Sequence, residues 1–281
     1  MKKISRRSFF RSASTLTLMP FLATAQETQT QQNLKFVHIT DSHMDLSIED
    51  SVEALELMVE MLNKDYKDLD FVVFGGDNFN NNVNGNADAL AFKKIVDKLH
   101  CPTYHVRGNK EANPKPNDAI ALDEFKTLFM SSKALKVQNK DWLLNIKGYA
   151  FLGLDSCIEG ANNGLYTEET LAFAESVLKQ GKPTIILNHH PYTNYWKSTD
   201  AKDIHKYVLN NTQETQKRLF TFDNFILSLS GHKHIDSVSL IHKTKAIVTR
   251  GFIRPLDMDM YPMRYIELKG KEISEKLIYT A

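Results

Sequence analysis

The sequence is poor in cysteine, has no surplus of charge and contains no long apolar run. Its 35 basic and 34 acidic side chains nearly cancel, so no bulk charge favours binding to nucleic acid or to an anionic membrane. Its two cysteines, Cys101 and Cys157, lie far apart in the chain. In an oxidising compartment they could form a disulfide, and otherwise they are two buried thiols. Because composition points to no partner, the function has to be inferred from a site.

Residues 1–25 (MKKISRRSFFRSASTLTLMPFLATA) are not expected to belong to the fold. They combine a basic start, the pair Arg6–Arg7, an apolar stretch and the small-residue end Ala23–Thr24–Ala25. This pattern is typical of a twin-arginine signal peptide. A membrane anchor would need about 20 apolar residues, and this stretch is shorter and contains Ser and Thr. We therefore expect export through the twin-arginine translocase to the periplasm, no stable membrane insertion, and a polar leader over residues 26–33.

From residue 34 to residue 281 the chain alternates strand-like and helix-like segments, which predicts one α/β domain. A hairpin is predicted over 141–155, and the tail from residue 225 is a series of predicted strands. A mixed sheet or two packed sheets fits this order best. Buried strands are predicted over 34–40, 69–77, 102–109 and 183–191, and helices over 49–64, 87–99, 119–130 and 167–181.

Side chains that can bind metal follow five of the predicted strands. Each one taken singly has an ordinary explanation as a turn cap or a surface residue. Together they predict one site, because α/β folds place their sites at the carboxyl ends of strands. Counting one of the two adjacent histidines, they supply two carboxylates, one amide and four imidazoles. This set is enough for two divalent ions when one carboxylate bridges them. Mixed oxygen and nitrogen ligands suit Mn, Fe, Zn or Co. The residues are Asp41, His43, Asp77, Asn109, His189 or His190, His232 and His234.

This series of motifs resembles that of the calcineurin-like metallophosphoesterases, which have D-x-H, G-D, G-N-H-[DE], H-x-P and G-H-x-H in this order. The resemblance runs from about Leu34 to about Val238. It implies a four-layer α/β/β/α sandwich of two mixed β-sheets flanked by helices. Residues 152–178 further resemble the branch of class III cyclic nucleotide phosphodiesterases and glycerophosphodiesterases. Amidohydrolases and β-lactamase-like hydrolases fit less well, because they have H-x-H early in the chain and here it comes late.

The resemblance also implies a ligand set and a reaction. Asp41, His43 and His234 would hold one ion, Asn109, His189 and His232 the other, and Asp77 would bridge them. His189 is preferred because it stands two residues before Pro191, with His190 as the alternative. Metal-bound hydroxide would then hydrolyse a small phosphorylated substrate, either a phosphodiester or a phosphomonoester. The segment 152–178 favours diesters, whereas an additional cation facing the phosphate would favour the more highly charged monoester.

One position departs from the family pattern, because Lys110 stands where the motif G-N-H-[DE] has its histidine. That histidine is taken to contact the phosphate and to protonate the leaving group, and a general acid of this kind contributes about 10²- to 10⁴-fold. Lys110 could replace it as a cationic phosphate contact and, near two metal ions, as a proton donor. Alternatively, the proton comes from His190, His205 or water, or the substrate has an acidic leaving group. In a third interpretation the protein binds metal and a phosphorylated ligand without hydrolysing it.

A few residues close to these motifs are weaker candidates. Arg250 and Arg254 could bind a phosphate, although an exposed or structurally paired arginine explains them equally well. Arg107 lies next to the site, and His105 is expected to face the core. The walls of a substrate pocket are expected to include Phe79, its asparagine-rich loop and residues 192–200.

Overall fold

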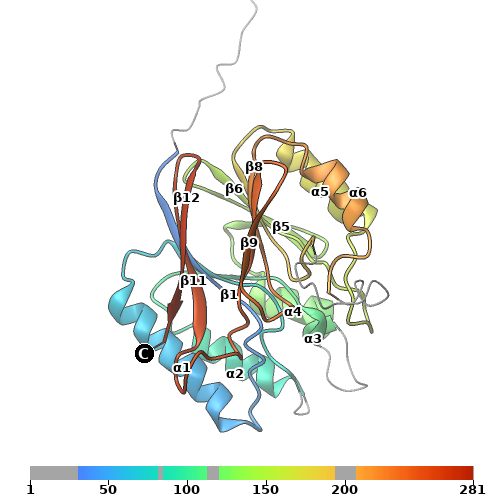
Figure 1. The fold of residues 1–281 in the computed structure, drawn as a ribbon. Coiled ribbons are helices and arrows are strands. Elements are labelled where there is room, and N and C mark those ends of the chain that lie inside the picture. The colour runs from blue at the N-terminus through green and yellow to red at the C-terminus, as the bar shows by residue number, and fades with distance from the viewer. Residues whose placement is uncertain (1–30, 82–84, 113–119, 194–206, 281) are drawn as a thin grey trace, which may run out of the picture.

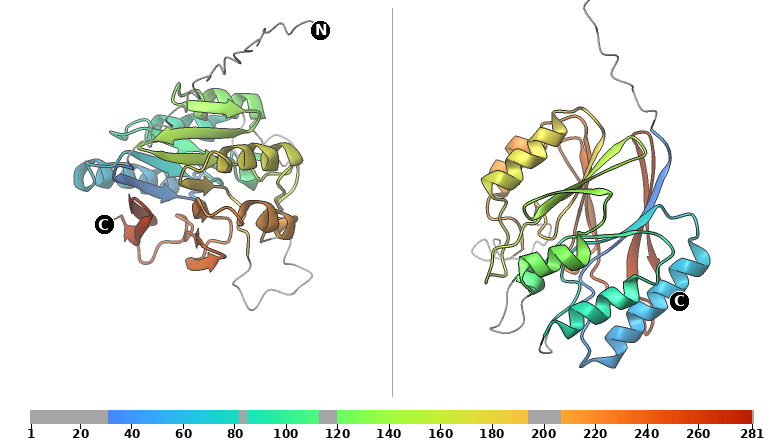
Figure 2. Two further views of the ribbon diagram at one scale, coloured as in Figure 1. Left: turned by 90° about the horizontal axis from the view of Figure 1, so that it is seen from above. Right: turned by 180° about the vertical axis from the view of Figure 1, so that it is seen from behind.

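The computed structural model describes residues 31–81, 85–112, 120–193 and 207–280, which form two β-sheets packed against each other with helices on the outside (Figure 1). Figure 2 shows the same layers from above and from behind. The predicted α/β/β/α sandwich of two mixed sheets is therefore confirmed. The predicted signal peptide and most of the leader lie outside the described residues. Within the described ranges, no helix is both long and apolar enough to cross a membrane.

The first sheet has five strands in the order β12-β11-β1-β2-β3. The neighbours β1, β2 and β3 are parallel, whereas β11 and β12 pair antiparallel. Because parallel strands point the same way, the carboxyl ends of β1, β2 and β3 lie at one edge of the sheet. The strands are β1 (Leu34–Ile39), β2 (Phe71–Phe74), β3 (Thr103–His105), β11 (Pro262–Lys269) and β12 (Glu272–Tyr279).

The second sheet has seven strands in the order β4-β5-β6-β7-β8-β10-β9. Its centre, from β6 to β10, is parallel, and the predicted hairpin appears as the antiparallel pair β5 and β6. The strands are β4 (Leu135–Gln138), β5 (Asp141–Ile146), β6 (Tyr149–Gly153), β7 (Thr184–Leu187), β8 (Phe225–Ser230), β9 (Ser237–Ile241) and β10 (Thr244–Val248).

The helices cover the outer faces of the two sheets (Figures 1 and 2). α5 and α6 lie against the seven-stranded sheet, and α1 and α2 lie against the five-stranded sheet. Thr167 caps α5 by accepting the backbone N–H of Thr170, and Gly181 at φ 77° follows its last turn. The helices are α1 (Glu49–Asp65), α2 (Ala87–Val96), α3 (Asn109–Ala112), α4 (Leu122–Phe129), α5 (Glu168–Leu178) and α6 (Thr212–Leu219).

Aromatic side chains join the two sheets in the middle of the sandwich. Phe36 of β1 stacks on Phe71 of β2 at 5.0 Å between ring centroids, and the edge of Phe151 from β6 meets Phe36 at 5.4 Å. The next residue on β6, Leu152, points the other way and packs in the cluster under α5. This alternation is expected of strands covered on both faces. It fixes the register in which the strand ends of both sheets reach the same side of the molecule.

The predicted strands and helices all occur at their predicted places, with shorter bounds at several ends. Four elements were not predicted, namely α3, β4, α6 and β9. The four-residue α3 and β4 are too short to show a period, and α6 is almost entirely polar. Cys101 and Cys157 are free and buried, which agrees with the interpretation as two thiols and not with a disulfide.

Asp141, the first residue of β5, provides a stability test of the fold. It is buried, and its carboxylate accepts the backbone N–H of Asp155 at 2.8 Å. Burial raises the pKa of Asp141 to about 7. A folded-state pKa above that of the unfolded chain gives stability that is present at low pH and is lost as the pH rises through about 7.

We therefore expect Asp141→Asn, which keeps the accepting oxygen, to gain stability relative to the wild type between pH 4 and pH 8, by roughly 4 kcal/mol at most. Urea unfolding of the metal-free protein at several pH values measures this difference. Asp123→Asn is the control, because the Asp123 side chain is 97% exposed. A difference that does not vary with pH would contradict the assignment.

Candidate metal centre

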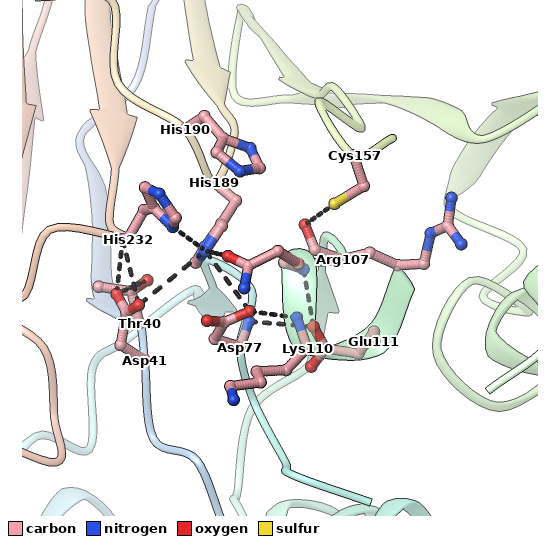
Figure 3. Close-up of polar contacts among 12 residues, drawn as sticks. Thr40, Asp41, Asp77, Arg107, Lys110, Glu111, Cys157, His189, His190 and His232 are labelled. Carbon is pink, nitrogen blue, oxygen red and sulfur yellow. Dashed lines mark hydrogen bonds and ion pairs between the residues drawn. The ribbon is translucent and has the colours of Figure 1, made fainter. Parts of the chain in front are cut away.

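Strand ends from both sheets bring one cluster of acids and imidazoles together (Figure 3). Asp41 follows β1, Asp77 follows β2, and Asn109 is the first residue of α3, just after β3. From the seven-stranded sheet, His189 follows β7 and His232 follows β8. The sandwich therefore places residues from five distant segments around one point, as the motif order predicted.

Left-handed backbone conformations turn several of these side chains inwards. Outside glycine they cost roughly 1 to 3 kcal/mol per residue and persist only where the surrounding structure holds them. The chain also approaches itself closely here, since a Cβ on Gly108 would lie 2.2 Å from the Asp77 nitrogen. The residues with positive φ in the cluster are Asp41 (56°), His43 (46°), Asp77 (51°), His232 (67°) and His234 (54°).

Asp41, His43 and His234 form the first half of the cluster. Asp41 Oδ1 lies 3.1 Å from His234 Nε2, which lies 3.2 Å from His43 Nε2. The Asp41 carboxylate is fully buried and accepts the backbone N–H of His232 at 2.9 Å. Burial alone would raise the pKa of Asp41, but the contact with His234 and the charge of His189 outweigh it and lower that pKa. Asp41 is therefore a carboxylate whose remaining oxygen faces imidazole nitrogens.

His189, Asn109 and His232 form the second half. His189 Nε2 lies 3.2 Å from both Asn109 Oδ1 and His232 Nδ1. The other ring nitrogen of His189, Nδ1, lies 2.9 Å from the carbonyl oxygen of Gly75. Because a carbonyl only accepts, Nδ1 carries a proton in this contact and Nε2 faces the cluster. Asn109 is held by its amide, whose Nδ2 donates to Asn162 Oδ1 at 3.3 Å.

Asp77 lies between the two halves. Its Oδ2 is 3.6 Å from His43 Nε2, and its Oδ1 is 3.5 Å from His189 Nε2. The residue is 3% exposed. Burial opposes ionisation of Asp77, but the charge of His189 and its hydrogen bond to Asp77 lower its pKa well below the usual range. One oxygen of the carboxylate is thus directed to each half.

The spacing and chemistry of these atoms fit divalent ions. An ion with bonds of about 2.0 to 2.2 Å keeps its ligand atoms about 3.0 to 3.6 Å apart, and the donor atoms of the cluster lie 3.1 to 3.6 Å from their neighbours. Two pairs of imidazole nitrogens also face each other at 3.2 Å. Lone pairs cannot face each other so closely without a cation or a proton between them. Among the residues that the structure describes, three acid and histidine sets could hold an ion: Asp41 with His43 and His234, Asp41 with Asp77 and His189, and His189 with His190 and His232.

His190 is close enough to count among these groups, but its hydrogen bonds do not favour a role as ligand or proton donor. Its Nε2 lies 3.1 Å from the carbonyl oxygen of Asn162, so this nitrogen must carry the proton. Its Nδ1 then accepts from the hydroxyl of Ser156 at 2.8 Å. Both nitrogens are therefore occupied, and the ring packs 4.4 Å from that of His232. Burial and the neighbouring His232 keep the pKa of His190 well below its usual range, so the ring is neutral.

Lys110 stands on the rim of the cluster. Its backbone nitrogen donates to Asp77 Oδ1 at 2.7 Å, while its side chain is exposed. In Figure 3 that side chain extends away from Arg107, towards the side on which Asp77 and Asp41 lie. The second residue of α3 thus fixes the orientation of Asp77 through its backbone, whatever its side chain, and its side chain adds a positive charge next to the cluster.

Glu111 holds the two loops that present Asp77 and Asn109, a role that sequence analysis did not assign. Its fully buried carboxylate accepts the backbone N–H groups of Asp77 at 3.0 Å, Asn78 at 2.6 Å and Gly108 at 2.7 Å. Burial and the charge of Asp77 raise the pKa of Glu111 to about 7. The only signal in the sequence was an acidic residue two positions after Asn109.

Arg107 is a structural anchor beside the cluster. Its buried guanidinium donates to Asp155 Oδ2 at 2.6 Å and to Glu159 Oε1 at 2.8 Å. Asp155 belongs to the Leu-Asp-Ser stretch that resembles one phosphodiesterase branch. In this structure the stretch ties β6 to the loop before α3. Further along the segment 152–178, Gly164 leaves room for His190, since a Cβ there would lie 2.4 Å from that ring.

The weaker candidates divide into residues near the cluster and residues of the core. Arg250 donates to the carbonyl oxygens of Arg254 at 2.8 Å and Pro255 at 3.3 Å, so its guanidinium is paired with its own loop, and Arg254 is exposed. His105 is buried and stacks on Phe74, as predicted. The prediction that Phe79 forms a pocket wall is wrong, because Phe79 is fully buried against Phe92 and Phe129. His205 and residues 194–200 lie outside the described residues.

The chain matches the family model of calcineurin-like phosphoesterases over residues 34–236, which is well over half of its length. The chain therefore belongs to the calcineurin-like phosphoesterase family. No curated protein sequence matches it.

Solved structures share the fold at low sequence identity. A dimetal phosphatase from Danio rerio aligns with a TM-score of 0.66 at 13% identity, covering 88% of this chain and 99% of that one. The purple acid phosphatase PPD1 from yellow lupin (Lupinus luteus) has a TM-score of 0.63 at 10% identity, over 90% of this chain and 52% of that one. GAP50, the anchor in the inner membrane complex of Plasmodium, has a TM-score of 0.55 at 15% identity, over 88% and 85%. At these identities the likeness establishes the fold.

Glu111→Gln tests how the loops are held. The amide keeps the shape but turns an N–H₂ group towards at least one backbone N–H, so a buried donor loses its acceptor. We expect the metal-free protein to lose about 1 to 3 kcal/mol of unfolding free energy at pH 5. The loss should shrink as the pH rises through about 7, because ionisation of Glu111, whose pKa is raised, already destabilises the wild type there. Urea unfolding in the presence of a chelator measures this loss. Glu56→Gln, on the exposed face of α1, is the control, and equal stability of the two variants would refute the role of Glu111.

Proposed function

We propose that this protein hydrolyses a small phosphorylated substrate with two divalent ions, Mn, Fe, Zn or Co, bound in the cluster. Membership of the phosphoesterase family supports the reaction class. The position of Asp77, with one oxygen towards each half of the cluster, is the observation that supports two ions. In this proposal Asp41, His43 and His234 bind one ion, Asn109, His189 and His232 bind the other, and Asp77 is shared.

Two bound ions would polarise the phosphoryl group and generate the nucleophile from water at neutral pH. The residues of the chain supply the rest. Asp41 and Asp77 provide negative charge in a buried setting, and Gly75 fixes the tautomer of His189. Lys110 carries an exposed positive charge at the rim, where it could contact the phosphate and supply a proton to the leaving oxygen. In the proposal His190 is a packing partner of His232 and not the acid.

The sequence is compatible with both diesters and monoesters as substrates, and two contacts in the structure bear on this choice. The Leu-Asp-Ser stretch favoured diesters through its resemblance, yet Asp155 is occupied by Arg107. Lys110 next to Asp77 adds a positive charge at the rim, which suits the higher charge of a monoester. We retain phosphodiester hydrolysis as the first assay and monoester hydrolysis as its comparison.

Residues 1–25 support a second part of the proposal, which is independent of the cluster. The protein would be exported by the twin-arginine translocase and would act in the periplasm. Fractionation of cells that express the full chain, with Arg6→Lys/Arg7→Lys as the comparison, measures this. The double substitution should retain the protein in the cytoplasm, because the arginine pair is the feature that the translocase recognises.

Hydrolysis of an activated aryl phosphodiester and of the matching monoester tests the reaction. We expect activity in the Mn²⁺-loaded wild type, loss of activity with a chelator, and loss in Asp77→Ala because the shared ligand is gone. Lys110→Met should lower kcat/KM at least tenfold. Lys64→Met, an exposed lysine at the end of α1, is the matched control and should keep full activity.

A series of leaving groups separates the possible roles of Lys110. If Lys110 donates the proton, the loss in Lys110→Met grows as the leaving group becomes more basic, whereas a pure phosphate contact gives a uniform loss. Lys110→His, which restores the family motif, should retain activity in either case. A wild type that binds two ions but hydrolyses neither ester would refute the hydrolase proposal for these substrates and favour a protein that binds a phosphorylated ligand.

A further inference from the structure

Asn80 lies three residues after Asp77, outside the proposed ligand set, and touches it at one point. Asn80 Oδ1 is 3.0 Å from His43 Nδ1, on the side of the ring that faces away from the cluster. On the other side of its amide, Asn80 Nδ2 donates to Asp45 Oδ2 at 3.1 Å. Asp45, Asn80 and His43 thus form a chain of side-chain hydrogen bonds that ends at the proposed first metal site.

The chemistry of this chain allows one arrangement. The Asp45 carboxylate only accepts hydrogen bonds, so the Asn80 amide must turn Nδ2 towards it and Oδ1 towards His43. An amide oxygen also only accepts, so His43 Nδ1 must carry a proton. The lone pair of the imidazole is then on Nε2, the atom that lies 3.2 Å from His234 Nε2 and 3.6 Å from Asp77 Oδ2.

The backbone fixes the positions from which these side chains act. The backbone N–H of His43 donates to the backbone carbonyl of Asp77 at 2.9 Å. The backbone N–H of Asn80 donates to the backbone carbonyl of Met44 at 2.9 Å. Asp45, which is 1% exposed, accepts the backbone N–H of Ser47 at 2.9 Å. The loops after β1 and β2 are therefore joined on both sides of the side-chain contact.

We propose that Asn80 is a positioning residue, oriented by Asp45, that holds His43 in the tautomer able to bind the first metal ion. This inference rests on the proposed function, because it presumes that His43 binds a metal. Partners of this kind behind a metal-bound histidine typically contribute about 10- to 100-fold in metal affinity. Nothing in the spacing of the motifs assigns this role to Asn80 or Asp45.

Calorimetric titration of the metal-free full chain with Mn²⁺ tests the proposal. Asn80→Leu keeps the branched shape of the side chain but removes both hydrogen bonds, and we expect one equivalent of Mn²⁺ to bind about 10- to 100-fold more weakly. The double variant Asp45→Asn/Asn80→Asp exchanges donor and acceptor, so that a carboxylate at position 80 accepts from both His43 and position 45. The affinity of this double variant for that equivalent of Mn²⁺ should be at least one third of the wild-type affinity.

Two further measurements separate positioning from packing. The ¹⁵N shifts of His43 in the metal-free protein should report the Nδ1–H tautomer in the wild type and in the exchanged variant, and should change in Asn80→Leu. Asn63→Leu is the matched control, because Asn63 also ties two segments together through its amide, on α1 and away from the cluster. It should lower stability without changing Mn²⁺ binding.

The outcomes are distinct. If the wild type binds neither Mn²⁺ nor Fe²⁺, Zn²⁺ or Co²⁺, the proposed function fails together with this inference. If the wild type binds Mn²⁺ and Asn80→Leu binds it equally well, the inference fails and the proposed function stands. If Asn80→Leu weakens binding but the exchanged variant does not restore it, orientation by Asp45 is refuted.

Discussion

Two buried carboxylates, Asp41 and Asp77, are the constraint on which the rest of this structure depends. Each is at most 3% exposed, and a buried charge without partners costs several kcal/mol. The fold supplies those partners in two ways. Backbone N–H groups from His232 and Lys110 donate directly to the two carboxylates, and four imidazoles from three loops surround them. The proposed ions would complete this neutralisation, which ties metal binding to the stability of the fold.

The cluster exists only where the two sheets meet. Asp41, His43, Asp77 and Asn109 come from loops of the five-stranded sheet, and the remaining histidines come from the seven-stranded sheet. The aromatic contacts between Phe36, Phe71 and Phe151 hold the sheets in the register that aligns these loops. A change in the core that shifts one sheet against the other would therefore separate the ligands within each half of the cluster.

Around the proposed ligands lies a layer of polar residues that fixes their orientation. Glu111 holds the loops of Asp77 and Asn109 through three backbone N–H groups, and Asn162 orients Asn109. Such residues act through others, so a sequence motif does not state their role even where it contains them, as G-N-H-[DE] contains the acid that is Glu111 here. Position 110 also contributes to this layer through its backbone, which donates to Asp77. Because this contact does not depend on the side chain, a lysine can stand there in place of a histidine.

The sequence by itself determined the order of the elements, the α/β class and the strand ends that carry the cluster. This was possible because buried strands and amphipathic helices have distinct periods, and because sites in α/β folds form where strands end. The tertiary structure alone decided what each side chain touches. It placed Phe79 in the core, bound both nitrogens of His190, and brought Asn80 and Asp45 behind His43. These outcomes depend on contacts between segments far apart in the chain, or on the exact rotation of a side chain, and neither is encoded in local spacing.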